Sequence, residues 1–229
     1  MKNKILLTIC LLISFHVKAQ VSVEYSVNYG AYNMTDMKNY LSNARTDILS
    51  IVPGLEIATT DNFPSYMIHT IGVGYNIDNH EFGLRGSYLT TAGKISYADY
   101  SGKISYEIKV NGYRAGLFYR YYFQRLDIGS RQAISFFGGL SPSLIFSKIE
   151  INREILPAND FITPFNKSAN NADISVLPEI GLLYGITNHL GITLSVGYEI
   201  NTASSISDLD NHKVEWSGTR IGAGIRYRL

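Results

Sequence analysis

Cysteine is almost absent from this chain, which has 229 residues and a single cysteine, Cys10. A chain with one cysteine has no disulfide framework and no Cys-x-x-Cys metal or redox motif. Charged residues are also scarce, at 17% of the chain against the usual quarter. No His-Glu-x-x-His motif and no phosphate-binding glycine motif occurs in the sequence. We therefore expect no catalytic residues, no cofactor and no metal.

Long apolar runs are missing too, and the longest one lies at the N-terminus. Two lysines precede an apolar stretch at 5–15, and Val17-Lys18-Ala19 then supplies small residues of the kind found before a cleavage site. This order predicts a signal peptide over residues 1–19, cleaved after Ala19, so that the exported chain begins at Gln20. The stretch is shorter than the ~20 residues that a membrane-spanning helix needs. Cys10 follows Ile9 rather than a small residue, which argues against a lipoprotein signal.

A strong charge of one sign is lacking as well. Removing Lys2, Lys4 and Lys18 leaves 20 − 3 = 17 basic residues against 19 acidic ones, a net charge of −2. Such a chain has no overall positive field to attract nucleic acid. We therefore expect no nucleic-acid partner.

What the chain does have is alternation of apolar and polar residues, together with 17 Tyr and 20 Gly. Period-two alternation marks strands with two unlike faces. Eight segments show it: 21–31, 66–77, 82–88, 104–123, 133–146, 174–187, 190–200 and 214–229. An even number of strands, most near the ~9–11 residues that cross a bilayer when tilted, predicts an all-β, eight-stranded antiparallel up-and-down transmembrane barrel over residues 20–229. By composition alone, a secreted β-sandwich fits almost as well.

The connections between these segments favour the barrel. Asp78-Asn79 and Asn188-His189 form short turns, whereas the connections at 34–65, 93–103, 147–173 and 201–213 are long. Short periplasmic turns and long outer loops are typical of outer-membrane barrels. The expected location is therefore the outer membrane of a Gram-negative bacterium, with outer-membrane lipid and the barrel-insertion machinery as partners.

The polar face of the strands carries charge. Ten charged residues alternate with the apolar face: Glu24, Glu81, Arg85, Arg114, Arg120, Glu179, Glu199, Arg220, Arg226 and Arg228. Charges in a narrow lumen must pair to offset desolvation, so we expect an ionic network. Eight strands leave an interior that side chains can fill. These residues predict a filled lumen rather than an open pore. The six Arg outnumber the four Glu, and an unpaired basic excess would favour transport; Glu107, whose phase is uncertain, would narrow that excess.

Two further segments depart from simple alternation. The apolar phase of the 104–123 strand changes sides between Val110 and Tyr113, which predicts a β-bulge near Gly112. The segment Thr35–Ser50 instead has helical spacing, with Thr35 or Asp36 as a cap and Pro53-Gly54 as its end. Its apolar face holds Met37, Tyr40, Leu41, Ala44, Ile48 and Ile51. This amphipathic helix is either a lid over the outer mouth or a surface helix that packs locally.

The chain resembles small Bacteroidetes outer-membrane barrels, the PorT-like, OmpA- and OmpX-sized beta-barrel domains. The resemblance rests on Lys18-Ala19-Gln20, on the Tyr-Ser-Val-Asn-Tyr-Gly strand at 25–30 with the helix after it, and on the closing strand at 222–229. Many such barrels end in an aromatic residue, whereas this chain ends in Leu229. The resemblance implies a fold and a location, and members of the group vary in role.

Two classes of function remain open. The first is a structural or partner-binding barrel that presents its outer loops to an envelope protein. The second is a transport- or secretion-associated barrel, with a narrow channel or an accessory role. A lipid-modifying enzyme is a remote third alternative, since His69 or His212 could join Ser207, Asp208 and Asp210 in a His-Ser-acid trio. Asp208, Asp210, Asn211 and His212 look like a weak Ca²⁺ loop but lack the glycine and the glutamate of an EF-hand.

Overall fold

The computed structural model describes residues 21–51, 54, 56–60, 63–64, 66–100, 102–129, 132–157, 165–206 and 212–229. The expected signal peptide, its cleavage site and Gln20 lie outside these residues, and so does Pro53. Within the described part of the chain, no helix has the length and apolar character needed to cross a membrane.

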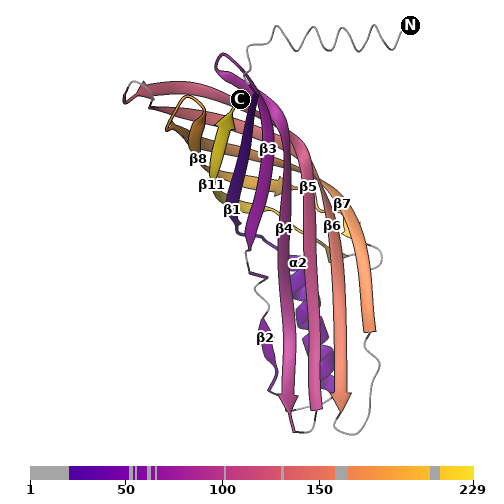
Figure 1. Ribbon diagram of the computed structural model, residues 1–229. Helices are drawn as coiled ribbons and strands as arrows, with labels where there is room; N and C mark the ends of the chain where they lie inside the picture. Colours follow the sequence, from indigo (N-terminus) through magenta and orange to yellow (C-terminus); the bar gives the residue numbers. More distant parts are fainter. Residues whose placement is uncertain are drawn as a thin grey trace, which may run out of the picture.

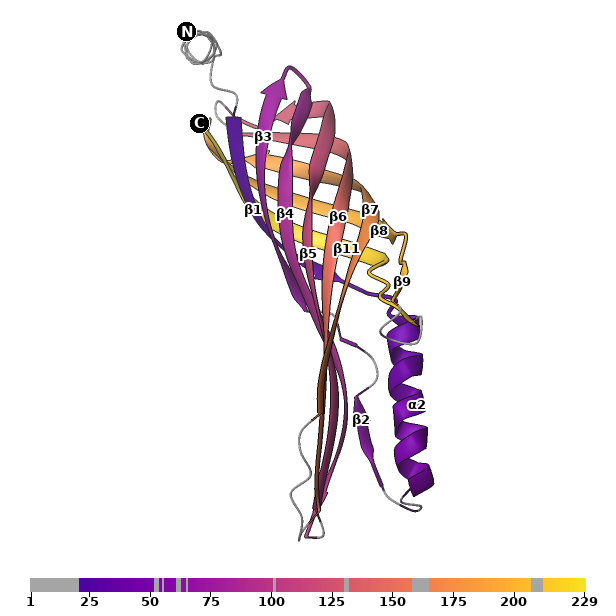
Figure 2. The same cartoon turned by 90° about the vertical axis from the view of Figure 1, so that its right-hand side faces the viewer.

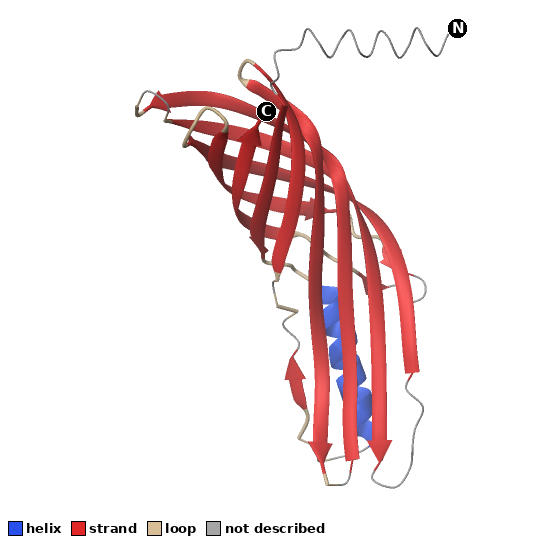
Figure 3. Ribbon diagram, viewed as in Figure 1, coloured by secondary structure: helices blue, strands red, loops and turns tan. Residues whose placement is uncertain are grey.

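Eight long strands of the described chain form a closed ring (Figures 1 and 3). They are β1 (Val21–Gly30), β3 (Met67–Ile77), β4 (His80–Asp99), β5 (Gly102–Asp127), β6 (Ala133–Pro157), β7 (Phe165–Gly185), β8 (Leu190–Asn201) and β11 (Gly218–Arg228). Each pairs antiparallel with the next in chain order, and β1 pairs with β11 to close the ring. The predicted eight-stranded antiparallel barrel is confirmed.

The wall of the barrel has an apolar outer face and a polar inner face. Along β3, Ile71 and Val73 are 58% and 48% exposed, while Thr70 between the outward residues is buried. The same alternation runs along β8 and β11, where Ile192 and Ile225 face outward opposite each other. Because successive side chains point to opposite faces of a strand, the period-two pattern determines which residues line the lumen.

Strands β4 to β7 continue well beyond the barrel as a narrow sheet, which we call the blade (Figure 2). The blade comprises residues 89–99, 102–112, 147–157 and 165–173, with the short edge strand β2 (Ala58–Thr60) paired to β4. The predicted loops at 93–103 and 147–173 are therefore wrong, because most of their described residues are strand. The connection at 202–217, which carries the small hairpin of β9 (Ser205–Ile206) and β10 (His212–Lys213), is long as expected.

The predicted bulge near Gly112 is also wrong. The pairs between β4 and β5 run without a break from His80–Tyr121 to Asp99–Gly102. The register shift in β5 lies instead between Tyr122 and Gln124, against β6. Gly112 has a different purpose: a Cβ atom there would lie 2.9 Å from the ring of Trp216, so the glycine makes room for the indole.

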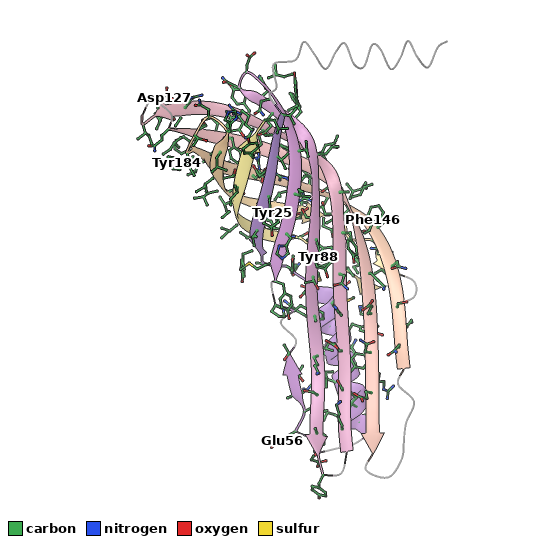
Figure 4. All side chains as sticks on the ribbon, in the orientation of Figure 1. Tyr25, Glu56, Tyr88, Asp127, Phe146 and Tyr184 are labelled. Atoms are coloured by element: carbon green, nitrogen blue, oxygen red, sulfur yellow. The ribbon has the colours of Figure 1, made fainter. Side chains whose placement is uncertain are left out.

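The change of phase in β5 comes from a change in surroundings along an unbroken strand. Arg114 in the barrel and Ile108 in the blade lie on the same inner face. In the blade that inner face is covered by the helix α2 (Thr35–Ile51), so it is apolar, and the opposite face is polar. At the end of the barrel wall, the apolar residues of β5 thus change from the outer to the inner face, although the strand itself continues there without a bulge. Tyr88 and Phe146, labelled in Figure 4, are the last large apolar residues on the outer face of β4 and β6.

Helix α2 runs along the blade, not across the mouth of the barrel (Figure 2). Met37, Leu41 and Ile48 are buried against the sheet, which supports the locally packing surface helix over the lid. Leu41 and Phe63 approach the backbone of β4 at Gly93 so closely that a Cβ there would lie within 3 Å of both. The Asp36 carboxylate accepts a hydrogen bond from the backbone N–H of Lys213 (3.2 Å), which ties the helix to β10.

Candidate functional site: the lumen and its outer mouth

Arg120 of β5 lies at the centre of a buried ionic cluster in the lumen. Its guanidinium donates to both carboxylate oxygens of Glu24 on β1, at 2.7 and 2.9 Å. It also reaches Glu179 on β7, at 3.3 Å. Bidentate pairs, such as that with Glu24, are the strongest and most directional that arginine forms. Because β5 and β1 are not neighbours in the ring, the Arg120–Glu24 pair joins two separate parts of the barrel wall.

Two more arginines extend this cluster. Arg85 donates to Glu179 (2.9 Å) and to Ser141 (3.1 Å). Arg226 on the last strand pairs with Glu81 (2.8 Å), which also accepts hydrogen bonds from the hydroxyls of Ser22 and Tyr122 and lies 3.9 Å from Arg120. Nearly every carboxylate oxygen in the cluster thus has a charged or hydroxyl partner, which offsets the cost of burial.

A second cluster lies nearer the blade. Arg114 and Arg220 both approach Glu199 Oε2, each at 3.4 Å. Arg114 Nε also donates to Ser143 (2.6 Å), and Arg220 Nη2 donates to the backbone oxygen of Trp216 (2.9 Å). Glu199 is fully buried, and its Oε1 has no partner among the described atoms.

Of the ten charged residues predicted for the lumen, the structure brings nine together. Arg228 is the exception: it is exposed at the short-turn end and pairs with no carboxylate of the described chain. Glu107, whose phase the sequence left open, lies on the outer face of the blade opposite Lys94. The paired interior thus holds five arginines against four glutamates.

Little free space remains between these side chains. The cavity among the two clusters has a volume of about 20 Å³, which is room for about one water molecule. Phe118 and Phe137 fill much of the rest, with the Arg120 guanidinium 5.3 and 4.6 Å from their ring centroids. At the short-turn end the lumen opens into a cavity of about 280 Å³ beside Arg226 and Arg228.

The mouth at the blade end is closed by an apolar cap. The indole of Trp216 is fully buried, packs edge-on against Tyr32 at 4.8 Å, and donates to Ser147 (2.8 Å). Met34 is buried beside them, and the Arg220 guanidinium lies 4.8 Å from the centroid of Tyr32. Burial raises the pKa of the Tyr32 phenol to about 12. The lumen is therefore closed on the blade side and open on the other.

The residues weighed for catalysis and metal binding do not form a site in the described chain. His69 lies on the outer face of β3, where Nδ1 contacts the hydroxyl of Tyr25 (2.8 Å). His212 packs against Tyr40 near the blade. Ser207, Asp208, Asp210 and Asn211 lie outside the described residues. Among the described residues no group of three or more His, Cys, Asp or Glu side chains could hold a metal ion.

The sequence reasoning missed the aromatic members of the lumen. Tyr122 and Phe137 lie on the inner face, and the Tyr122 hydroxyl contacts both Glu81 and Arg226. Alternation puts both residues on the inner face, since Tyr121, Phe123 and Phe136 are outward, but only the charged residues of that face were considered as lumen residues. The single tryptophan could have been found as a candidate plug, because it precedes the last strand at the long-loop end.

The architecture defined by these features is a small, closed eight-stranded barrel with a charge-filled lumen. Among solved structures, the chain is similar to Neisserial surface protein A (12% identity, 92% of this chain and 98% of that one, TM-score 0.45). It is also similar to the N-terminal β-barrel domain of Pseudomonas aeruginosa OprF (13% identity, 93% and 100%, TM-score 0.39). A third is Ail, the attachment invasion locus protein of Yersinia pestis (16% identity, 91% and 96%, TM-score 0.37).

With TM-scores below 0.5, these likenesses carry no argument about function. No protein-family model matches the chain, and no curated protein matches it. The expected membership of the Bacteroidetes, PorT-like group stays a prediction.

Proposed function

We propose that this protein is an integral outer-membrane barrel of a Gram-negative bacterium, which anchors a rigid blade outside the cell and presents it to an envelope or extracellular partner. One observation carries the proposal: the outer face of β4 to β7 changes from apolar to polar at one level. On the barrel side of that level, Leu84, Leu117 and Leu144 are 65%, 59% and 48% exposed. On the blade side, lysines, glutamates and polar residues occupy the same face.

An exposed apolar belt of this size requires lipid around it, because in water it would drive aggregation. Large aromatic residues border the belt at both ends, as in transmembrane barrels: Tyr88 and Tyr113 pack together near the blade, and Phe82 packs against Tyr119 near the short turns. The closed ring leaves no unpaired sheet edge in the belt, as a bilayer demands. Short turns are typical of the periplasmic side, which puts the blade outside the cell.

The blade favours partner binding over a purely structural role. A stable helix and a long sheet replace the loops that such barrels use on the outside, and Tyr100 at the tip of the β4–β5 hairpin is 97% exposed. A fully exposed aromatic side chain far from the membrane is suited to contact another protein. Among the described residues, the side chains of the two ionic clusters leave a cavity of only about 20 Å³, which favours a barrel that does not transport.

Fractionation and conductance test the proposal together. The protein should be recovered with outer membranes and should fold in detergent as a heat-modifiable species. Planar-bilayer recordings should show no steady conductance of porin size, because the Arg–Glu clusters and the apolar cap fill the lumen. Recovery as a soluble periplasmic protein would refute the membrane assignment, and a steady open-channel current would favour the transport-associated alternative.

A further inference from the structure

A groove lies on the outer face at the level where the apolar belt ends and the blade begins. It has a volume of about 540 Å³, and its outward-facing lining comes from three neighbouring strands: Tyr113, Phe146, Lys148, Asn170 and Ala172. Tyr113 is paired with Phe146, and Phe146 with Ala172. Small Ala172 beside a large phenylalanine leaves the hollow.

The two halves of the groove differ in chemistry. On the barrel side, Tyr113 and Phe146 are 54% and 49% exposed and continue the apolar belt. On the blade side, Lys148 is paired with Asn170 in register and both are exposed. Phe146 and Lys148 are alternate residues of one strand, so their side chains leave the same face about 7 Å apart. An occupant must therefore be apolar at one end and polar at the other.

The polar half has a local excess of positive charge. Lys148 Nζ lies 2.7 Å from Glu150 Oε1, and Lys109 of the neighbouring strand is directly opposite Glu150. Lys109 therefore adds a second positive charge beside the same carboxylate. The hydrogen bond to Glu150 raises the pKa of Lys148, so the ammonium stays charged at neutral pH. Its side chain is still half-exposed and can reach an anionic group from the solvent side.

We propose that this groove binds a phosphorylated glycolipid of the outer leaflet, with a phosphate on Lys148 and an acyl chain against Phe146 and Ala172. The inference rests on the proposed membrane location and adds a specific ligand site to it. The groove is continuous with the lipid-facing belt, so a lipid reaches it without leaving the bilayer. A cation at the depth of the headgroups is the feature that recognises an anionic headgroup, and the asparagine amide next to it can donate to a sugar hydroxyl.

The chain contains a matched control for this site. Lys103 pairs with Glu154 at 2.8 Å, and its side chain is 50% exposed, the same fraction as that of Lys148. That pair lies at the far end of the blade, where no apolar belt adjoins it. Removing either lysine removes one equivalent surface ion pair. Any difference in lipid binding between the two variants therefore comes from the place of Lys148 beside the groove.

The experiment measures binding of diphosphoryl lipid A to the purified full-length protein in phosphatidylcholine nanodiscs. Lys148→Gln should weaken binding about tenfold, the loss expected for one charge-assisted contact, whereas Lys103→Gln should leave it unchanged. Glu150→Gln should strengthen binding, because both lysines then lack their competing carboxylate. Removing the phosphates from the lipid should abolish the difference between Lys148→Gln and the unmodified protein.

Three outcomes overturn the inference: equal binding by the two lysine variants, equal binding of phosphorylated and phosphate-free lipid, or full competition by millimolar inorganic phosphate. The last would identify a simple anion site without a lipid. If the protein inserts into the nanodiscs and one of these results appears, the glycolipid site alone fails. If the protein does not enter a bilayer at all, the proposed membrane anchor fails first.

Discussion

The guanidinium of Arg120 and the carboxylate of Glu24 face each other squarely across the lumen, with two parallel hydrogen bonds of 2.7 and 2.9 Å. The two residues are 96 positions apart in the sequence and lie on strands that are not neighbours in the sheet. Their contact therefore braces the barrel from within, independently of the strand-to-strand hydrogen bonds.

Replacing Arg120 should destabilise the barrel strongly. Arg120→Met leaves Glu24 and Glu179 buried without their shared cation, a situation that typically costs about 3–5 kcal/mol. Denaturant titration of the folded protein in detergent measures this loss. Arg125→Met, which removes an exposed pair with Asp127, should cost no more than about 1 kcal/mol. The Arg120→Met, Glu24→Gln double variant should lose less than the sum of the single losses; strict additivity would show that the two groups do not interact.

Gly112→Ala should loosen the cap. The added methyl would lie 2.9 Å from the Trp216 ring, and overpacking of this size costs about 1–3 kcal/mol. Because Trp216 is the single tryptophan, its fluorescence reports the cap directly, and we expect a red shift with easier quenching by iodide. Gly138→Ala is the control, since a Cβ at that position meets nothing within 4 Å. An unchanged Trp216 spectrum in Gly112→Ala would contradict the packing described for the cap.

Strand β11 should show a strict division between its two faces. Ile225 is 59% exposed and lies opposite Tyr25 and Ile192, whereas Arg226 is buried. Ile225→Arg should cost roughly 2–4 kcal/mol near the middle of the bilayer. The single cysteine, Cys10, lies in the expected signal peptide, so cysteines introduced into the exported chain should be labelled without background. A lipid-soluble maleimide should label a cysteine at position 225 and spare one at 226, and the opposite pattern would mean that the register of the strand is wrong.

The cap should weaken at high pH. The pKa of Tyr32 is raised to about 12 by burial, so between about pH 10 and 12 the unfolded chain loses this proton while the folded chain keeps it. The stabilisation is complete below pH 10 and disappears as the pH rises through 12, and the total loss is on the order of 3 kcal/mol. Tyr32→Phe should remove this part of the alkaline loss. Stability curves of the two proteins from pH 9 to 12 make the comparison, and parallel curves would show that Tyr32 does not contribute.

The barrel could be predicted from the sequence because lipid on one side and a packed lumen on the other impose a strict alternation. The pattern places Arg226 on the polar face of the last strand and so puts its neighbour Ile225 on the apolar face, and burial in the structure agrees. The positions of the inner charges could be predicted in the same way, since each charged residue alternates with apolar residues along its strand. Which charges pair could not be predicted, because Arg120 and Glu24 are brought together by ring closure and not by any local pattern.

The blade was missed for a related physical reason. Beyond the barrel the polar side of β5 becomes the outer one, and the alternation at Ile108 and Val110 reverses. A sequence pattern shows which residues share the apolar face. It does not show whether a change of phase comes from a bulge in the strand or from a new element that covers the other face. The reversal at Gly112 was therefore attributed to a bulge, although it marks the beginning of the contact with Trp216 and the surface covered by α2.

The unbroken pairing of β4 and β5 also has a mechanical meaning. All 20 residues of β4, from His80 at the short turn to Asp99 at the tip, are paired with β5 in one register. A pull on the tip along the strands draws β4 and β5 in the same direction, so the hydrogen bonds between them carry little of the load. The force passes along both strands into the wall, where the bonds of β4 to β3 and of β5 to β6 resist it in shear. The blade therefore acts as a stiff lever rooted in the wall of the barrel, and tension applied by a partner at Tyr100 is transmitted to the anchor without first unzipping the hairpin.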